Sequence, residues 1–222
     1  MKMNRVLAVA LVVSAGLMSM GCDVKKNMED IGLKKGENPT EKVVIKYDTL
    51  VERDEVCNQK WADYEAQLQR RADLIPMLVN TVKGYAAHEK DTLTSVMEAR
   101  ASATQVKLTA EDMSNPEKMK AFQEAQDKMK GSLSRLMMVQ EKYPELKADA
   151  RFHDLMVSME GTENRILLAR KKYNESVMQY NVELRKVSGK AVNPVTGFEF
   201  KPRLPFAAAE SAKVAPTVDF SK

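Results

Sequence analysis

The chain has 222 residues and a formal net charge of +4, with 44% hydrophobic and 30% charged residues. The hydrophobic fraction is enough for a packed core and excludes a chain that is disordered throughout. Aromatic residues make up 6% and there are 9 glycines, which argues against an all-β sandwich and against glycine-loop nucleotide binding. The 2 cysteines and 2 histidines exclude a disulfide-rich scaffold, a four-cysteine zinc site and a three-histidine metal site within one chain.

The N-terminus is interpreted as a signal peptide. Lys2 and Arg5 form a positively charged start, and an uncharged, largely apolar run from 6 to 20 follows. This run is shorter than the roughly 20 residues that a membrane-spanning helix needs. It ends at Gly21-Cys22, where small residues before a cysteine resemble the lipobox of bacterial lipoproteins. The resemblance implies cleavage before Cys22 and attachment of acyl chains such as palmitate to that residue.

Two other fates of this N-terminal segment stay open. Ser19 and Gly21 also satisfy the small-x-small pattern of ordinary secretory cleavage, and the segment could instead remain uncleaved as a short membrane anchor. Ser19 also departs from the leucine that is usual in the lipobox. Asp23 resembles an inner-membrane retention signal of enteric bacteria. We expect a protein attached to a bacterial membrane on its extracytoplasmic side, with the choice between inner and outer membrane left open.

The distribution of proline, glycine and charge divides the chain into four parts. These are a signal peptide (1–21), a lipidated cysteine with a tether (22–42), a helical region (43–187) and a proline-containing tail (188–222). In the helical region, glycine and proline are rare and apolar residues recur at three- and four-residue spacings, which is typical of amphipathic helices. In the tail, Phe198, Phe200 and Phe206 are expected to dock on these helices, and the remainder is expected to be irregular.

Prolines divide the helical region into four segments. Asn115 and Pro116 form a helix start, with asparagine as the N-cap and proline at the first helical position. Pro144 ends the third segment and opens the fourth. Pro76 is placed at a break between the first two segments, with Asp73 as the N-cap of the second. The alternative is one long helix that is merely kinked at Pro76.

The four segments predict an all-α fold, an antiparallel up-and-down four-helix bundle with long helices, a flexible N-terminal tether and an irregular C-terminal tail. The spacing is that of a left-handed, coiled-coil-like seam. In this bundle the turns at 70–76 and 141–146 share the end that points away from the membrane. The charged residues near this end are either an interaction site or a solvated cluster that caps a helix. The candidate interaction residues are Arg70, Arg71, Asp73 and Glu145.

Motifs for catalysis or cofactor binding are not found in the sequence, so we expect no enzyme activity and no cofactor. His88 and His153 are each followed by an acidic residue and are interpreted as surface pairs, so no metal site is expected. Cys57 lies on the apolar stripe beside Trp61 and is interpreted as a packing residue rather than a reactive thiol. Nothing in the charge indicates a nucleic-acid partner.

Polar residues occupy several positions of the apolar stripes, among them Asp54. One interpretation is a hydrogen-bonded network that fixes the register of the helices, which is favoured because buried ions require partners. The other is a polar cleft between helices that could bind a small ligand or a metal. The residues of this polar seam are Glu89, Glu163, Arg170, Tyr173 and Asn174.

Two separated motifs, in the same order along the chain, resemble the LemA family. The first is QLQRRADLIPMLV at 67–79, continued by TVKGY at 81–85 and by His88-Glu89. The second is YPELKA at 143–148, continued by Glu163, Ile166, Ala169-Arg170, Tyr173-Asn174 and Tyr180-Asn181. Together they cover about residues 43–187. Met77 and Asp48 stand where the family favours asparagine, which affects only the polar roles expected at those two positions.

The resemblance implies a membrane-anchored, extracytoplasmic helical bundle without an established catalytic reaction. A branch of the family is associated with magnetosome membranes, which implies a connection with membrane organisation. Here a lipoprotein-type signal replaces the usual N-terminal membrane helix. The expected function is therefore that of a non-enzymatic envelope protein, a scaffold or a bundle that binds an envelope protein. The alternative is an envelope sensor that binds a small ligand or metal at the polar seam.

Overall fold

The computed structural model describes residues 39–190 and 192–207, and this part of the chain is helical without any strand. The all-α prediction is confirmed. The long helices are α3 (Pro39–Tyr85), α4 (Lys90–Gln105), α5 (Pro116–Val139) and α7 (Ala150–Arg185). The short elements are η1 (Asp112–Ser114), η2 (Gln140–Lys142), α6 (Pro144–Lys147), α8 (Val187–Lys190) and α9 (Val192–Thr196). The predicted signal peptide and Cys22 lie outside the described residues.

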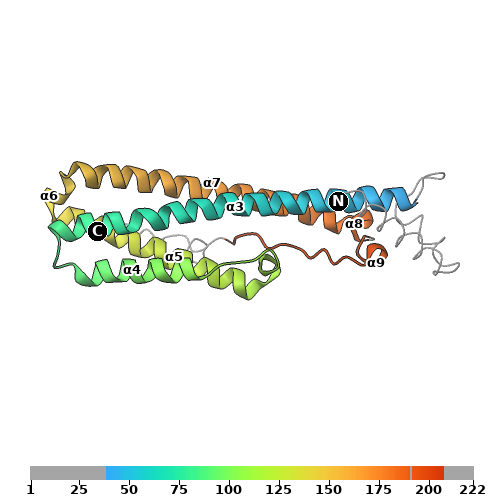
Figure 1. The fold of residues 1–222 in the computed structure, drawn as a ribbon, viewed down its shortest axis with the longest axis horizontal. Helices are drawn as coiled ribbons and strands as arrows, with labels where there is room; N and C mark the ends of the chain where they lie inside the picture. Colours follow the sequence, from blue (N-terminus) through green and yellow to red (C-terminus); the bar gives the residue numbers. More distant parts are fainter. Residues whose placement is uncertain (1–38, 191, 208–222) are drawn as a thin grey trace, which may run out of the picture.

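The molecule is elongated, and consecutive long helices run in opposite directions (Figure 1). Helices α3 and α7 pack against each other, while the shorter α4 and α5 pair beside them and cover only part of their length. The start of α3 lies at one end of the molecule together with α8 and α9. The connection between α3 and α4 lies at the opposite end, close to α6 (Figure 1). The chain therefore enters and leaves the helical part at the same end.

Side-chain caps fix the starts of two long helices. The Asn115 side chain accepts hydrogen bonds from the backbone N–H groups of Glu117 (3.0 Å) and Lys118 (3.2 Å), and Pro116 is the first residue of α5, as predicted. Pro144 opens only the four-residue helix α6. The long helix α7 begins after a second cap, in which the Asp149 carboxylate accepts from the N–H of Phe152 at 2.7 Å.

The predicted break at Pro76 is wrong, because α3 continues through this residue to Tyr85. A proline has no N–H, so the carbonyl of Ala72 one turn earlier loses its usual donor. The Arg100 side chain of α4 replaces that donor, with Nε at 2.7 Å from the Ala72 carbonyl oxygen. On either side of the proline, Ile75 and Leu78 are buried, so packing against neighbouring helices also holds this stretch helical.

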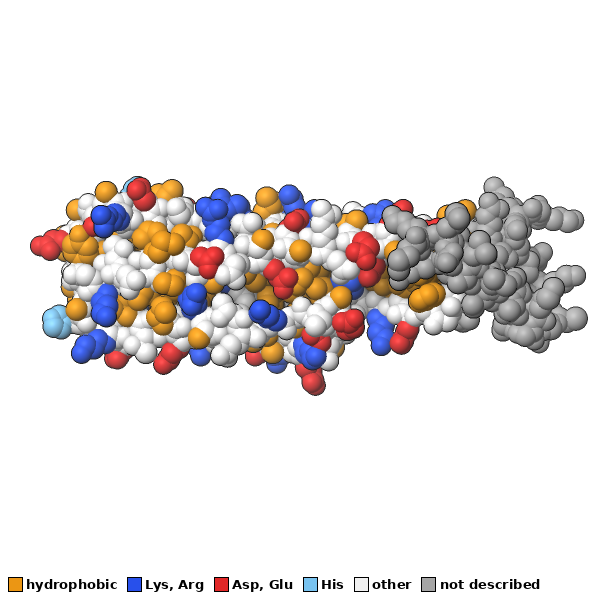
Figure 2. All heavy atoms as spheres, viewed as in Figure 1, with side chains coloured by type: hydrophobic (Ala, Val, Ile, Leu, Met, Phe, Trp, Pro, Cys, Tyr) orange, Lys and Arg blue, Asp and Glu red, His pale blue; other side chains and the backbone are white. Residues whose placement is uncertain are grey.

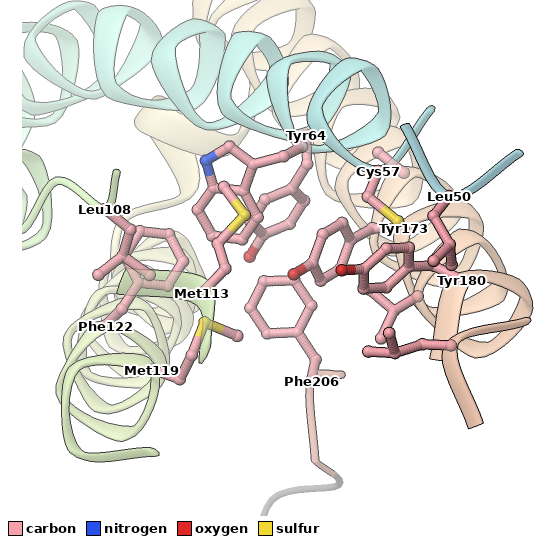
Figure 3. Packing of buried hydrophobic residues seen from close by; sticks show 14 of the residues in the cluster. Leu50, Cys57, Tyr64, Leu108, Met113, Met119, Phe122, Tyr173, Tyr180 and Phe206 are labelled. Atoms are coloured by element: carbon pink, nitrogen blue, oxygen red, sulfur yellow. The ribbon is translucent and has the colours of Figure 1, made fainter. Parts of the chain in front are cut away.

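The hydrophobic core has two clusters along the molecule. The distal cluster, which includes Ile75, Leu133 and Phe152, lies toward the α3–α4 connection. The aromatic cluster lies toward the other half and includes Trp61, Phe122, Tyr173, Tyr180 and Phe206. In Figure 3 the labelled side chains of this cluster converge from α3, α5, α7 and the connection between α4 and α5, and Phe206 enters it from the C-terminal segment. A residue of the tail is thus part of the core.

Cys57 is a fully buried free cysteine of the aromatic cluster. Burial raises the pKa of its thiol, although a hydrogen bond with Ser176 acts in the opposite direction. A protonated, inaccessible thiol is a packing group rather than a nucleophile. The prediction of a packing role for Cys57 is confirmed.

The contact at Pro76 gives the first prediction. Replacing Arg100 by methionine leaves the Ala72 carbonyl without a donor and should lower the free energy of unfolding by about 1–3 kcal/mol. In a Pro76→Ala background, the restored N–H of residue 76 donates to the Ala72 carbonyl. The Arg100→Met replacement should then lower the free energy of unfolding by clearly less. Urea denaturation of the four proteins of this double-mutant cycle measures the difference. Equal costs in the two backgrounds would show that Arg100 does not compensate for Pro76.

Candidate functional site

The C-terminal segment 198–207, called here the strap, runs back along the helices toward the middle of the molecule (Figure 1). The reversal occurs at Gly197, which has a φ of 72° and follows the last residue of α9. Its N–H donates to the carbonyl of Asn193 at 3.0 Å, as in a left-handed helix C-cap that favours glycine. The described part of the tail therefore has a defined course along the helices.

Two asparagines of α7 hold the backbone of the strap. The Asn174 amide donates to the carbonyl of Phe206 (3.2 Å) and accepts from the N–H of the same residue (2.9 Å). The Asn181 amide makes the same pair of bonds with Arg203, at 2.7 Å and 3.0 Å. An asparagine amide carries one acceptor and one donor group, so each side chain satisfies both backbone groups of one strap residue.

The tyrosine before each asparagine adds one more backbone contact. The hydroxyl of Tyr173 donates to the carbonyl of Leu204 at 3.3 Å, and the hydroxyl of Tyr180 donates to the carbonyl of Lys201 at 3.0 Å. Each Tyr-Asn pair of α7 thus contacts one strap carbonyl and then both backbone groups of the residue two positions later. The same contact pattern occurs twice. The strap runs antiparallel to α7, so the first Tyr-Asn pair of the helix binds the later strap residues.

The spacing of the two Tyr-Asn pairs matches the geometry of an extended chain. Seven helical residues advance by about 10.5 Å, and three residues of a polyproline-type chain by about 9.3 Å. Pro202 and Pro205 favour this extended conformation in the residues that precede them and lack an N–H group. The N–H groups that α7 binds belong to Arg203 and Phe206, which directly follow the prolines. The two Tyr-Asn pairs are called here the ladder.

Arg203 is the charged anchor of the strap and is only 4% exposed. Its guanidinium donates from Nε to Asp54 (2.7 Å), from Nη2 to Asn58 (2.7 Å) and from Nη1 to the Met113 sulfur (3.0 Å). Burial acts to lower the pKa of Arg203, but the hydrogen bond and negative charge of Asp54 outweigh it and raise the pKa. The side chain therefore stays charged and ties the strap to α3 and η1.

Phe206 is the apolar anchor of the strap. It is 7% exposed, and its ring stacks on Trp61 with centroids 5.6 Å apart and an interplanar angle of 14°. Tyr173 meets the same ring edge-on at 5.4 Å. The predicted docking of Phe206 is confirmed. Phe200 packs against the aromatic cluster and contacts Tyr47, whereas the ring of Phe198 contacts Tyr47 but is half exposed.

A second polar group lies farther along the molecule, where Arg71 is only 4% exposed. Its Nη1 lies 3.2 Å from a carboxylate oxygen of Glu163 on α7, and its Nη2 donates to Gln126 on α5. Arg71 is therefore an internal link between three helices instead of a residue of an exposed end.

A hollow of about 360 Å³ opens beside this link, between α5 and α7. Its charged lining consists of Arg71, Asp127, Lys130, Glu163 and Arg170. Three cations and two carboxylates around one hollow can hold a small molecule that carries a negative group. The ring of Phe206 also lines it, so the hollow adjoins the bound strap.

The polar seam predicted from the sequence is divided among three places. Glu163 and Arg170 line the hollow, whereas Tyr173 and Asn174 bind the strap. Glu89 precedes α4 at the α3–α4 connection, where Lys142 Nζ and the hydroxyl of Tyr143 lie 3.5 Å from its carboxylate. Asp54, which also occupies an apolar position of the sequence pattern, binds Arg203.

The predicted grouping of Arg70, Arg71 and Asp73 with Glu145 at one end is not found. Because α3 continues through Pro76, the first three residues lie within this helix, whereas Glu145 lies on α6 at the end of the molecule. Arg70 and Asp73 are exposed, and the Asp73 carboxylate accepts from Gln69 at 2.7 Å. At the distal end itself, the hydroxyl of Tyr85 donates to Asp149 at 2.6 Å.

Acidic and basic side chains alternate over the visible face of the molecule, without an extended patch of one sign (Figure 2). Among residues 39–190 and 192–207, no three histidine, cysteine or acidic side chains are grouped so that they could hold a metal ion. Within the same residues, none of the helices combines the length and apolar character required to cross a membrane.

The strap contacts could only partly have been anticipated from the sequence. The repeated Tyr-Asn pair at an interval of seven residues and the prolines at 202 and 205 were available signals. These signals predict the strap contacts only if α7 is known to pair with the tail. The spacing of apolar residues in either segment does not show that pairing. Arg203 and Asn181 were therefore missed as binding residues.

Comparison with known proteins connects these features to a family. Residues 60–220 match the family described as the LemA family. The magnetosome proteins MamQ 2 and MamQ 1 of Paramagnetospirillum magneticum (strain ATCC 700264 / AMB-1) are each 26% identical to this chain over 173 residues. The aligned regions cover 71% of this chain and 64% of each relative, so the chain spans slightly less than two thirds of their length. The family match includes the strap.

The ladder gives the second prediction. Asn181→Ala removes both bonds to the Arg203 backbone, which together are worth about 1–3 kcal/mol, so the strap should open more often. Trypsin cleaves after arginine but cannot reach the buried Arg203 until the strap opens. Limited proteolysis should therefore cut the variant after Arg203 about tenfold faster than the wild type. Asn164→Ala, at an exposed asparagine of the same helix, is the matched control and should leave the rate unchanged. Equal rates in both variants would disprove a ladder that holds the strap.

Proposed function

Because the chain belongs to the LemA family, we propose that it is a non-enzymatic, membrane-anchored protein of the bacterial cell envelope that presents its helices to a partner protein. Its similarity to two proteins named for the magnetosome is consistent with a role at a membrane. We further propose that the four long helices act as one antiparallel bundle. Its anchor is the lipidated Cys22, which precedes the described residues.

The position of the N-terminal end of α3 carries this proposal. Helix α3 has 47 residues, which corresponds to a length of about 70 Å. The chain enters it at one end of the elongated molecule, next to α8 and α9 (Figure 1). A tether attached there would hold the bundle by this end and leave the opposite end, with α6, free to meet a partner.

Two surfaces are candidates for that contact. The first is the free end, where Glu145 is exposed on α6 and the neighbouring Lys147 pairs with Glu141. The second is the flank of α3 at Arg70 and Asp73, which are exposed. The free end is preferred because it is the part farthest from the proposed anchor.

Photocrosslinking in cells tests this arrangement. A photoreactive amino acid in place of Glu145 should give a discrete adduct with an envelope protein, whereas the same group in place of Lys190, at the anchored end, should not give that adduct. Cys22→Ala should release the protein from the membrane fraction and reduce the adduct, while Ser19→Ala should change neither. Equal adducts from positions 145 and 190, or membrane retention of the Cys22→Ala protein, would contradict the proposal.

A second candidate function is that of an envelope sensor for a small ligand. The observation that favours it is the hollow of about 360 Å³ lined by Arg71, Glu163 and Arg170. Guanidinium groups bind carboxylates and phosphates through paired hydrogen bonds, and Glu163 already holds Arg71 in position. The fitting ligand would be a small metabolite that carries a carboxylate or phosphate group.

Thermal unfolding tests this second candidate. A bound metabolite present at about 100 times its dissociation constant stabilises a protein by about 2.7 kcal/mol, which is a measurable rise in Tm. Anionic envelope metabolites should be screened against the wild type, and a positive compound should lose its effect with Arg170→Gln. Lys171→Gln, at the exposed neighbouring residue, should keep the effect. A screen without any shift, or a shift that survives Arg170→Gln, would reject the hollow as a ligand site.

A further inference from the structure

We propose that the groove between α3 and α7 is a recognition site for an extended Arg-x-x-Phe segment, and that the strap of a second copy of this chain can occupy it. Two molecules would then be linked by reciprocal exchange of their straps. This inference deepens the proposed scaffold role, because it names a second copy as a partner.

The ladder recognises backbone groups and would bind any chain with the same extended course. Each asparagine binds the N–H and carbonyl of one strap residue, and each tyrosine binds one further carbonyl. Binding an extended segment through its main chain provides affinity, and pockets for individual side chains provide specificity. Nothing in these contacts depends on the strap being covalently joined to the α7 that binds it.

Two strap side chains, three residues apart, enter pockets of opposite chemistry. Arg203 meets the Asp54 carboxylate and the Asn58 amide of α3, which select a guanidinium by charge and hydrogen bonding. Phe206 enters the aromatic cluster and stacks on Trp61. A segment without a cation at the first position would leave the partly buried Asp54 carboxylate without its ion-pair partner. The groove therefore selects the segment that this chain itself carries.

The connection between α7 and the strap is short. Only the short helices α8 and α9 and the turn at Gly197 separate them, and all lie at one end of the molecule (Figure 1). Asn193 of α9 binds the N–H and carbonyl of Phe200 at 3.0 Å each, so exchange must open this pair of bonds and form it again with the strap of the other copy. A change of backbone conformation at this turn can redirect the strap without breaking a long helix. Exchange of an identical element keeps every other contact and is a low-cost route to a dimer.

The Asp54–Arg203 pair allows a test that distinguishes a strap bound in the groove of its own chain from a strap bound in the groove of a second chain. A full-length Asp54→Arg chain has a positive groove and a positive strap, and a full-length Arg203→Asp chain has a negative groove and a negative strap. Each chain is mismatched with itself. In an exchanged pair both grooves are matched. The groove of the Asp54→Arg chain receives the strap with aspartate at position 203, and the groove of the other chain, which keeps Asp54, receives the strap with Arg203.

The two purified chains are refolded separately and together, and their masses and thermal midpoints are measured. We expect each chain alone to be monomeric with a lowered Tm, and the mixture to give a one-to-one heterodimer whose Tm recovers toward the wild-type value. The chain with both substitutions is the matched control and should resemble the wild type. If this control folds but the mixture contains only monomers with the lowered Tm, strap exchange is refuted.

A second pair of variants decides the question if the charge-reversed control does not fold. The rings of Tyr47 and Phe200 lie 5.6 Å apart in the aromatic contact at the start of the strap. Chains with Tyr47→Cys or Phe200→Cys, each with Cys22→Ser, are refolded together and treated with a short thiol crosslinker. A covalent heterodimer linked through positions 47 and 200 supports exchange. The control is a single chain with both cysteines, which should be crosslinked internally. If this control reacts and no heterodimer forms, exchange is rejected. Since purified protein is used, failure here would leave the proposed membrane anchor and envelope partner untouched.

Discussion

The buried charge of Arg203 is the constraint on which half of this molecule depends. A guanidinium removed from water costs several kcal/mol unless partners replace its hydration. Those partners come from α3 through Asp54 and Asn58, and from η1 through Met113, while α7 holds the backbone of the same residue through Asn181. The three side-chain contacts replace the hydration of the charged group. One residue of the tail thus contacts α3 and η1 through its side chain and α7 through its backbone.

The aromatic cluster follows from this constraint. Once Arg203 is fixed, the extended course of the strap places Phe206 three residues farther on, against Trp61 and Tyr173. Helices α4 and α5 cover only part of the length of α3 and α7, and the strap covers part of the remainder (Figure 1). The two hydrophobic clusters thus have different origins, since the distal one is made between helices whereas the aromatic one also requires the tail. The hollow lined by Arg71 adjoins the end of the strap.

Local features of the sequence predicted the helical class, the Asn115 cap and the packing role of Cys57, because each depends on residues within a few positions of one another. The features that were missed depend on distant partners. The local sequence at Pro76 predicts a helix break, because the compensating donor, Arg100, lies on another helix. Asp54 is an unusual polar residue in the apolar pattern, but its partner Arg203 lies 149 residues away. Periodicity identifies which face of a helix is buried, and it contains no information on what buries it.

The strap also has a consequence for the order in which the molecule is made. Ribosomes synthesise a chain from its N-terminus, and the residue that completes the aromatic cluster is Phe206 of 222. Until the strap emerges, Trp61 and Tyr173 lack the ring of Phe206, and Asp54 lacks the positive charge of Arg203. A chain that ends prematurely would carry every long helix and still expose apolar surface, which is the kind of surface that leads to aggregation and removal. Completion of the aromatic cluster thus depends on residues that are translated after every long helix.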